Sequence, residues 1–167
     1  FFDPATSSVG YIVADPETRA CAIIDPVLDY DPSGGRTSTH NADKMLAAIA
    51  AGGLRVQWII DTHVHADHLT AAAYMKRATG GKLAIGAEVG RVQSFFATLF
   101  NLSGDAAPRL ADFDRLFADG DTFAIGNLTA TAMHTPGHTP ACMAYLIGDA
   151  LFVGDTLFMT DYGTARC

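Results

Sequence analysis

Residues 61–68 read Asp61-Thr62-His63-Val64-His65-Ala66-Asp67-His68 and hold three of the six histidines of a 167-residue chain. They follow the apolar run 55–60, which predicts a buried strand, and precede an Ala-rich stretch that predicts a helix over 69–79. In an extended segment the first two of these histidines point to the same side, whereas the last two residues lie where the chain turns into the helix. Imidazole and carboxylate groups are ligands for zinc, iron and manganese, so we expect a metal site here.

Two further segments place candidate ligands after predicted strands. In His134-Thr135-Pro136-Gly137-His138 the Pro-Gly pair forces a tight loop, so we expect His138 to be a ligand and His134 to be structural. Asp155 follows a short apolar run and the small residue Gly154. Because the carboxyl ends of strands are where sites gather in α/β proteins, we expect these segments to meet. His63, His138 and Asp155 form a two-His-one-carboxylate set that suits non-haem Fe(II). The remaining candidates would allow a second metal ion, and they are His65, Asp67 and His68.

The composition excludes several classes of protein. Hydrophobic residues make up 49% and charged residues 17% of the chain, which argues against a disordered protein. A formal net charge of −7 argues against nucleic-acid binding, and no apolar run approaches the ~18 residues of a membrane span. The three cysteines fit no zinc-finger spacing, so we expect a reducing, cytoplasmic location. The length predicts a single domain over 1–167.

The pattern of apolar residues and turn residues predicts a layered α/β or α+β domain. We expect a hairpin from 9–14 and 20–24, a long polar loop over 29–40, and helices over 42–51 and 88–100. The second of these helices carries an apolar stripe, which we expect to face the core, at Val92, Phe95, Phe96 and Leu99. Short strands are predicted at 82–85, 122–125, 128–133, 141–147 and 151–153.

The motifs of this chain resemble those of the metallo-β-lactamase superfamily. The matching residues are His63-x-His65-x-Asp67-His68, then His138 within Thr135-Pro136-Gly137-His138-Thr139, then Gly154-Asp155-Thr156. The resemblance covers essentially the whole chain and implies an αββα sandwich with the site at the sheet edges. The family continues beyond this C-terminus, with a further histidine and closing helices, so we expect the sandwich to be C-terminally incomplete. An apolar face left exposed in this way would favour a homo-oligomer.

Within the superfamily, the chain is most similar to the persulfide dioxygenases and to the related glyoxalase II-type thioesterases. The similarity rests on Ile24-Asp25-Pro26-Val27-Leu28, on the three ligand segments, and on Asp161-Tyr162-Gly163-Thr164-Ala165-Arg166-Cys167. It implies a single Fe(II) on His63, His138 and Asp155 and a reaction of glutathione persulfide with O₂ that yields sulfite and glutathione. Asp67 and His68 are then expected to orient the catalytic site, and Arg166 to lie near a glutathione-binding site.

Two alternatives share the same ligand residues. One is a zinc-dependent hydrolase of glutathione thioesters, with one or two zinc ions held by the full set of six candidates. The other is a non-catalytic module that binds a metal ion without turnover. Under the two enzymatic hypotheses the expected partners are a small thiol or persulfide substrate and, for the dioxygenase, O₂, without nucleic acid or membrane.

Overall fold

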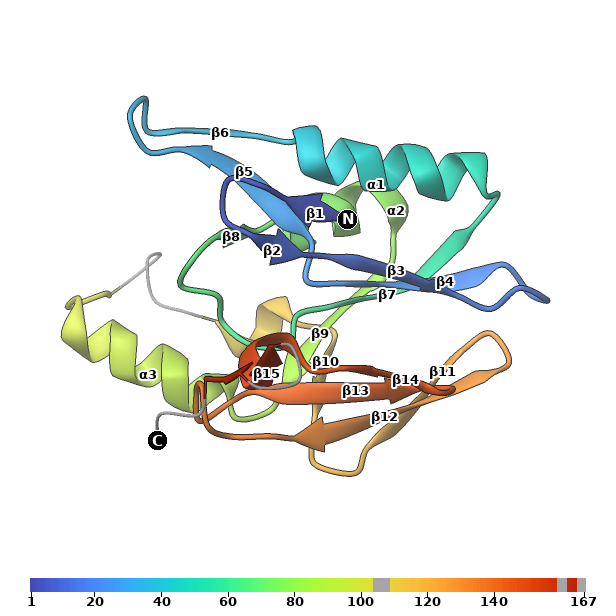
Figure 1. The fold of residues 1–167 in the computed structure, drawn as a ribbon. Helices are drawn as coiled ribbons and strands as arrows, with labels where there is room; N and C mark the ends of the chain where they lie inside the picture. The colour runs from blue at the N-terminus through green and yellow to red at the C-terminus, as the bar shows by residue number, and fades with distance from the viewer. Residues whose placement is uncertain (104–108, 159–161, 165–167) are drawn as a thin grey trace. The chain divides into compact units, whose positions relative to one another are not determined.

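The computed structural model describes residues 1–103, 109–158 and 162–164, and Figure 1 shows its helices and strands in chain order. The first half contains β1 (Phe2–Asp3), β2 (Ser8–Val9), β3 (Tyr11–Ala14), β4 (Ala20–Ile24), β5 (Val27–Asp31), β6 (Arg36–Ser38), α1 (His40–Ala51), β7 (Arg55–Ile60), β8 (Leu69–Thr70), α2 (Ala72–Thr79) and β9 (Lys82–Gly86). The second half contains α3 (Val89–Leu99), the 3₁₀ turn η2 (Leu110–Asp112), β10 (Arg115–Phe117), β11 (Thr122–Ile125), β12 (Leu128–His134), β13 (Met143–Ile147), β14 (Ala150–Phe152), the 3₁₀ turn η3 (Gly154–Thr156), β15 (Leu157–Phe158) and β16 (Tyr162–Gly163).

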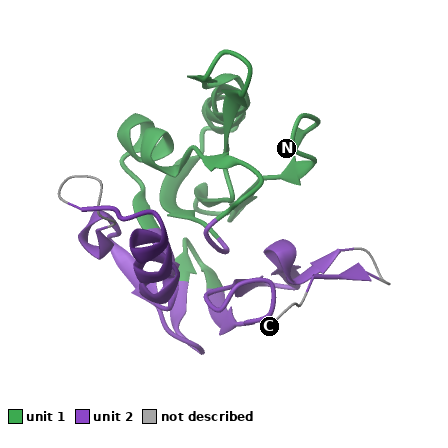
Figure 2. Ribbon diagram, turned by 90° about the vertical axis from the view of Figure 1, so that its left-hand side faces the viewer, with its two compact units in different colours: residues 1–61, 65–83, 124–129 green, residues 62–64, 84–123, 130–167 purple. Residues whose placement is uncertain are grey.

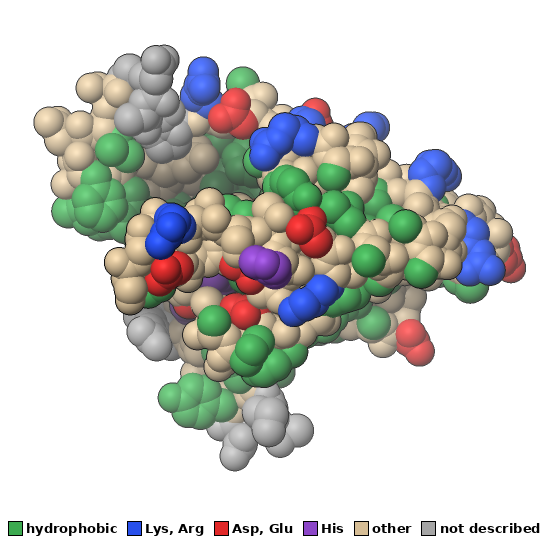
Figure 3. All heavy atoms as spheres, turned by 90° about the horizontal axis from the view of Figure 1, so that it is seen from above, with side chains coloured by type: hydrophobic (Ala, Val, Ile, Leu, Met, Phe, Trp, Pro, Cys, Tyr) green, Lys and Arg blue, Asp and Glu red, His purple; other side chains and the backbone are tan. Residues whose placement is uncertain are grey.

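The chain divides into two compact units, which Figure 2 distinguishes by colour. Unit 1 comprises residues 1–61, 65–83 and 124–129, and unit 2 comprises residues 62–64, 84–123 and 130–167. Among the described helices, none is long and apolar enough to cross a membrane. On the side that carries α1 in Figure 1, basic and acidic side chains are scattered among apolar ones (Figure 3).

The core of unit 1 forms around β4, whose five residues are all buried. This strand pairs antiparallel with β3 and parallel with β7, as its unbroken apolar sequence predicts for a strand covered on both faces. Helix α1 buries Ala42, Met45 and Ile49, which share one helical face. The predicted hairpin, the strand over 55–60 and this helix are therefore confirmed.

Unit 2 contains an antiparallel ladder and a short parallel pair. Strand β13 pairs with Ala130–His134 of β12 and with β14, while β10 pairs parallel with Ala84–Gly86 of β9. The rings of Phe117, Phe123 and Tyr145 contact one another, with centroids 4.5 to 6.2 Å apart, and form the aromatic part of this core. Strand β10 is absent from the predicted elements because its three residues are too few to show an alternation.

Two predicted elements are wrong. The polar stretch 29–40 is not a loop, because β5 and β6 form an antiparallel hairpin in which Tyr30 pairs with Thr37. The hairpin turns at Gly35, whose φ of +61° suits glycine. Because most side chains of this hairpin are polar, its sequence lacks the alternation of apolar and polar residues that would indicate strands. The predicted helix over 69–79 begins later than expected. Leu69–Thr70 form strand β8, which pairs with β5, and α2 begins only at Ala72.

The apolar stripe of α3 does not face a core. Val92 is buried, but Phe95, Phe96 and Leu99 are 63%, 40% and 60% exposed. Phe96 instead contacts its neighbours on the same helix, Phe95 edge-on and Phe100 by stacking. Periodicity predicts an apolar face correctly, but it does not say whether another element covers that face.

Candidate metal centres

The structure gathers the candidate ligands into two groups, one in each unit. The ligand atoms of His63, His138 and Asp155 lie within 4.8 Å of one another in unit 2. Those of His65, Asp67 and His68 do so in unit 1. We call these sets the triad and the second group. Each set combines imidazole nitrogens with a carboxylate, which is the donor combination that a borderline divalent metal ion prefers.

The triad is assembled from three segments of unit 2, each of which follows a strand in the chain. The amide of Met143 donates to the carbonyl oxygen of Thr62 at 2.9 Å, which attaches the residue before His63 to β13. Asp155 lies in η3 after β14, and its backbone oxygen accepts from the Thr164 hydroxyl. Its carboxylate lies 3.4 Å from Nε2 of His138 and 4.0 Å from Nε2 of His63.

Gly154 permits this placement of Asp155. Its φ is +50°, and a Cβ there would overlap the Thr62 side chain, whose own Cβ would be 2.8 Å away. A side chain at this position would thus both strain the backbone and displace the strand end that carries His63.

The donor groups of the triad are largely shielded from solvent, as the ligands of a bound metal ion usually are. The His63 side chain is 1% exposed and that of Asp155 is 28% exposed. The imidazole nitrogens nearest the Asp155 carboxylate are Nε2 of His138 and Nε2 of His63. Imidazole nitrogens gathered around a carboxylate in this way suit a divalent metal ion. His134, by contrast, takes no part in the triad, because its Nε2 lies 2.9 Å from the carbonyl oxygen of Pro140.

In the second group, Ser8 and Asp67 determine which nitrogen of His68 carries a hydrogen. Nδ1 of His68 lies 3.1 Å from both the Asp67 carboxylate and the Ser8 hydroxyl, which itself donates to Asp67 at 2.9 Å. Burial alone would raise the pKa of Asp67, but its hydrogen bonds with His68 and Ser8 lower it to about 2. An ionised carboxylate only accepts, so the Nδ1 of His68 that faces Asp67 carries a hydrogen. Nε2 of His68 is buried and has no hydrogen-bond partner among the described residues.

Besides the second group, His65 also belongs to a more deeply buried cluster of unit 1, which it forms with Asp25 and Asp61. Its Nε2 lies 3.1 Å from the carboxylate of Asp25, and the ligand atoms of Asp25, Asp61 and His65 all lie within 4.8 Å of one another. Burial opposes protonation of His65, but the hydrogen bond with Asp25 and the negative charges nearby raise its pKa to about 9. Burial also raises the pKa of Asp61, whose carboxylate accepts from the Thr70 hydroxyl at 3.0 Å.

Sequence reasoning missed the roles of Ser8, Asp25 and Asp61. Asp25 and Ser8 lie about forty and sixty residues before their histidine partners, and no local pattern signals such a pairing. One signal for Asp25 is its backbone, since it is a non-glycine residue with a φ of +48°. Arg166, the predicted substrate residue, lies outside the described residues.

The model of the metallo-beta-lactamase superfamily matches residues 3–167. A probable metallo-hydrolase of Burkholderia pseudomallei is 55% identical, with 100% of this chain and 60% of the relative covered. The hydroxyacylglutathione hydrolase of Rhodospirillum rubrum is 36% identical, with 92% and 49% covered. The mitochondrial persulfide dioxygenase ETHE1 of Homo sapiens is 27% identical, with 97% and 53% covered.

Among solved structures, ETHE1 from Myxococcus xanthus superposes with a TM-score of 0.71 at 28% sequence identity. The match covers 99% of this chain and 62% of that one. The chain therefore spans about half to three fifths of the length of these proteins.

Proposed function

Since the chain belongs to the metallo-beta-lactamase superfamily, we propose that it supplies the metal-binding part of a metal-dependent hydrolase that acts on thioesters. The superfamily's α/β fold is confirmed by the family match and by the superposition on ETHE1. The relatives named as hydrolases are 55% and 36% identical, whereas the human persulfide dioxygenase is 27% identical. The comparisons thus favour the hydrolase alternative over the dioxygenase hypothesis.

The observation that carries this proposal is the second group. His65, Asp67 and His68 have their ligand atoms within 4.8 Å of one another, in addition to the complete triad of unit 2. A mononuclear iron site needs only the triad, whereas hydrolases commonly employ two metal ions. When bound, a divalent ion supplies Lewis-acid chemistry and lowers the pKa of a coordinated water.

Hydrogen bonds from neighbouring residues hold the side chains of the second group in orientations suited to binding a metal ion. Asp67 remains ionised because His68 and Ser8 both hydrogen-bond to it, so it offers a permanent negative charge at the site. The same bonds fix the ring of His68 with Nε2 directed away from Asp67. Asp25 holds the ring of His65 through its contact with Nε2.

A persulfide dioxygenase is the second candidate, and the triad favours it. His63, His138 and Asp155 form a two-His-one-carboxylate set, the arrangement found in non-haem Fe(II) oxygenases. The superposition on ETHE1 from Myxococcus xanthus, at a TM-score of 0.71, is consistent with the same chemistry.

A direct comparison of the two reactions tests the proposal. The chain is purified anaerobically, its metal content is measured by mass spectrometry, and hydrolysis of lactoyl-glutathione is followed beside O₂ uptake with glutathione persulfide. We expect zinc, thioester turnover and no O₂ uptake. Iron at one equivalent together with O₂ uptake would instead establish the dioxygenase.

A further inference from the structure

We propose that a pocket of unit 1 holds the apolar acyl chain of the substrate, with Leu28, Tyr30 and Leu69 as the residues that select it. This inference rests on the proposed function, because it places the reacting thioester at the second group. We call the three side chains the acyl strip.

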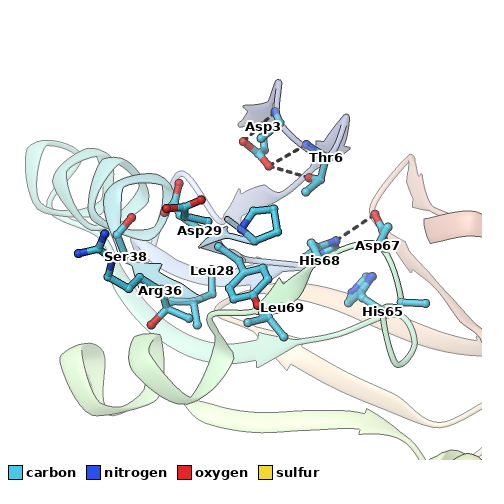
Figure 4. Close-up of a pocket in the computed structure, with 16 residues that line it drawn as sticks. Asp3, Thr6, Leu28, Asp29, Arg36, Ser38, His65, Asp67, His68 and Leu69 are labelled. Carbon is cyan, nitrogen blue, oxygen red and sulfur yellow. Dashed lines mark hydrogen bonds and ion pairs between the residues drawn. The ribbon is translucent and has the colours of Figure 1, made fainter. Parts of the chain in front are cut away.

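The pocket has the size of a small-molecule site. Its volume is about 900 Å³, within the usual range of roughly 300–1,000 Å³. Three segments of unit 1 line it, namely the β1–β2 turn, the β5–β6 hairpin and residues His65–Leu69 (Figure 4). The second group thus lies in the wall of the pocket, and a molecule bound there reaches His65, Asp67 and His68.

The register of the strands places the acyl strip on one face. Leu28 of β5 pairs with Leu69 of β8, so their side chains project from the same side of the sheet. Tyr30 follows Leu28 by two residues along β5 and therefore shares that side. Leu69 comes directly after His68, so the apolar surface begins where the second group ends.

The exposure of the acyl strip indicates that it is available to a ligand. Tyr30 is 52% exposed, Leu69 is 46% exposed and Leu28 is half-buried. Large apolar side chains that remain exposed beside a metal-ligand cluster can gain burial from a bound apolar group. The Tyr30 hydroxyl and its cross-strand neighbour Thr37 add polar groups at the far end of the strip.

Most of the acidic side chains of the pocket are already occupied by donors of the chain itself. Asp3 accepts from the hydroxyl of Thr6 at 2.6 Å, as Figure 4 shows, and Asp29 accepts from the Asn41 side chain at 2.8 Å. Asp31 accepts from the amide of Ser33 at 3.0 Å. Together with Asp67, these four carboxylates outnumber Arg36, the basic residue of the lining, so the pocket is unfavourable for an acyl group that is itself anionic. The class that fits best is therefore a neutral, apolar acyl chain.

Asn41 holds the pocket walls in place. Its side-chain nitrogen donates to Asp29 of β5 and, at 3.1 Å, to Asp3 of the β1–β2 turn. Its backbone amide also donates to Asp29, at 3.0 Å. The β5–β6 hairpin is thus fixed to the start of α1 and to the opposite wall of the pocket, which gives the acyl strip a defined position.

The kinetic test varies the acyl chain and keeps the thiol constant. We measure kcat/KM for acetyl, butyryl, hexanoyl and octanoyl thioesters of N-acetylcysteamine, a neutral thiol. We expect kcat/KM to rise at least tenfold from acetyl to octanoyl in the wild type. Tyr30→Ala should remove most of this rise, Tyr30→Phe should keep it, and Tyr11→Ala, an exposed tyrosine outside the pocket, should leave it unchanged. A profile that is flat with chain length, or the same in Tyr30→Ala as in the wild type, would overturn the inference.

A binding test separates this inference from the proposed function. S-octyl-N-acetylcysteamine, a thioether that cannot be hydrolysed, is titrated into the metal-free chain by calorimetry. Binding that Tyr30→Ala weakens at least tenfold supports the acyl strip, even if no thioester is hydrolysed. Absence of thioether binding refutes the acyl strip, even if the chain hydrolyses short thioesters.

Discussion

At the scale of single residues, both groups of candidate ligands depend on neighbouring side chains that hold the imidazoles in orientation. Ser8, Asp67 and His68 lie within 3.1 Å of one another in pairs, and this contact keeps a hydrogen on Nδ1 of the imidazole. Asp25 orients His65 in the same manner. Such supporting hydrogen bonds fix the orientation of metal ligands and thereby raise metal affinity.

Removal of the Ser8 hydroxyl should weaken metal binding at the second group. In Ser8→Ala the contact with Asp67 and His68 is lost, and we expect the affinity for zinc to fall by about 10- to 100-fold. Competition with a chromophoric chelator measures the affinity. Ser8→Thr retains a hydroxyl and serves as the control, so equal affinities in Ser8→Ala and the wild type would show that Ser8 does not support the site.

His138→Ala should lower the metal content of the chain by one equivalent. The variant removes an imidazole that lies 3.4 Å from Asp155 in the triad. His134→Gln is the matched control, because His134 ends β12 just before the loop that carries His138 and contacts the Pro140 carbonyl instead of the triad. Metal analysis after dialysis against zinc provides the measurement, and an unchanged stoichiometry in His138→Ala would mean that the ligand assignment is wrong.

The residue pattern identified the candidate ligands more completely than it identified their surroundings. Strand-end positions pointed to His138 and Asp155, which the structure brings together with His63, whereas His63 and His65, expected on one side of an extended segment, are divided between the triad and the second group. Asp25 and Ser8 could not be predicted in this way, since only the folded chain brings them to the histidines.

At the scale of elements, turns tie distant segments of unit 1 together. Asp15 directly follows β3, in the turn of the β3–β4 hairpin. Its carboxylate accepts hydrogen bonds from the Thr18 hydroxyl and from the backbone amide of Asn127, which is far away in the sequence. The β3–β4 hairpin was predictable because apolar strands flank a Pro-containing turn. The β5–β6 hairpin was not, because its residues are mostly polar and its pairing is visible only in the backbone.

The Asp15 turn should make the stability of the chain sensitive to acid. The hydrogen bond from Asn127, followed by that from Thr18, holds the pKa of Asp15 below its ordinary value of 3.8. A lowered folded-state pKa stabilises the fold above the unfolded-state value, and this stabilisation is lost as the pH falls through the folded-state pKa. We expect the wild type to have a higher Tm than Asp15→Asn at pH 7 and the difference to shrink below pH ~4. Thermal denaturation followed by circular dichroism measures it, and a difference that does not change with pH would contradict this role.

At the scale of the whole molecule, unit 2 exposes a large apolar surface on α3. Phe95, Leu99 and Phe100 are each at least 60% exposed, and Phe96 stacks on Phe100 beside them. Exposed apolar surfaces of this kind commonly mark sites of association. This surface is consistent with the expected homo-oligomer, and the C-terminal strands β14, β15 and β16 also expose large apolar side chains, at Leu151, Leu157, Phe158 and Tyr162.

A charge on α3 should therefore reduce self-association. We expect Phe95→Glu to shift the chain toward monomer in sedimentation velocity runs at rising concentration, because burying a carboxylate in an apolar contact is unfavourable. Ser94→Glu introduces the same charge at the neighbouring exposed position and should have a smaller effect. A wild type that remains monomeric at every concentration would contradict the prediction.

The left-handed backbone of Asp25 persists because its side chain holds His65. A non-glycine residue with a φ of +48° costs about 1–3 kcal/mol, and the Asp25 carboxylate lies 3.1 Å from Nε2 of the buried His65. Asp25→Gly should recover about 1 kcal/mol of backbone strain, but it also breaks a buried pair, which costs about 3–5 kcal/mol, so a lowered Tm should accompany a weakened zinc affinity. A laboratory evolution experiment that rewards heat resistance alone would then keep aspartate at position 25, and with it the orientation of His65.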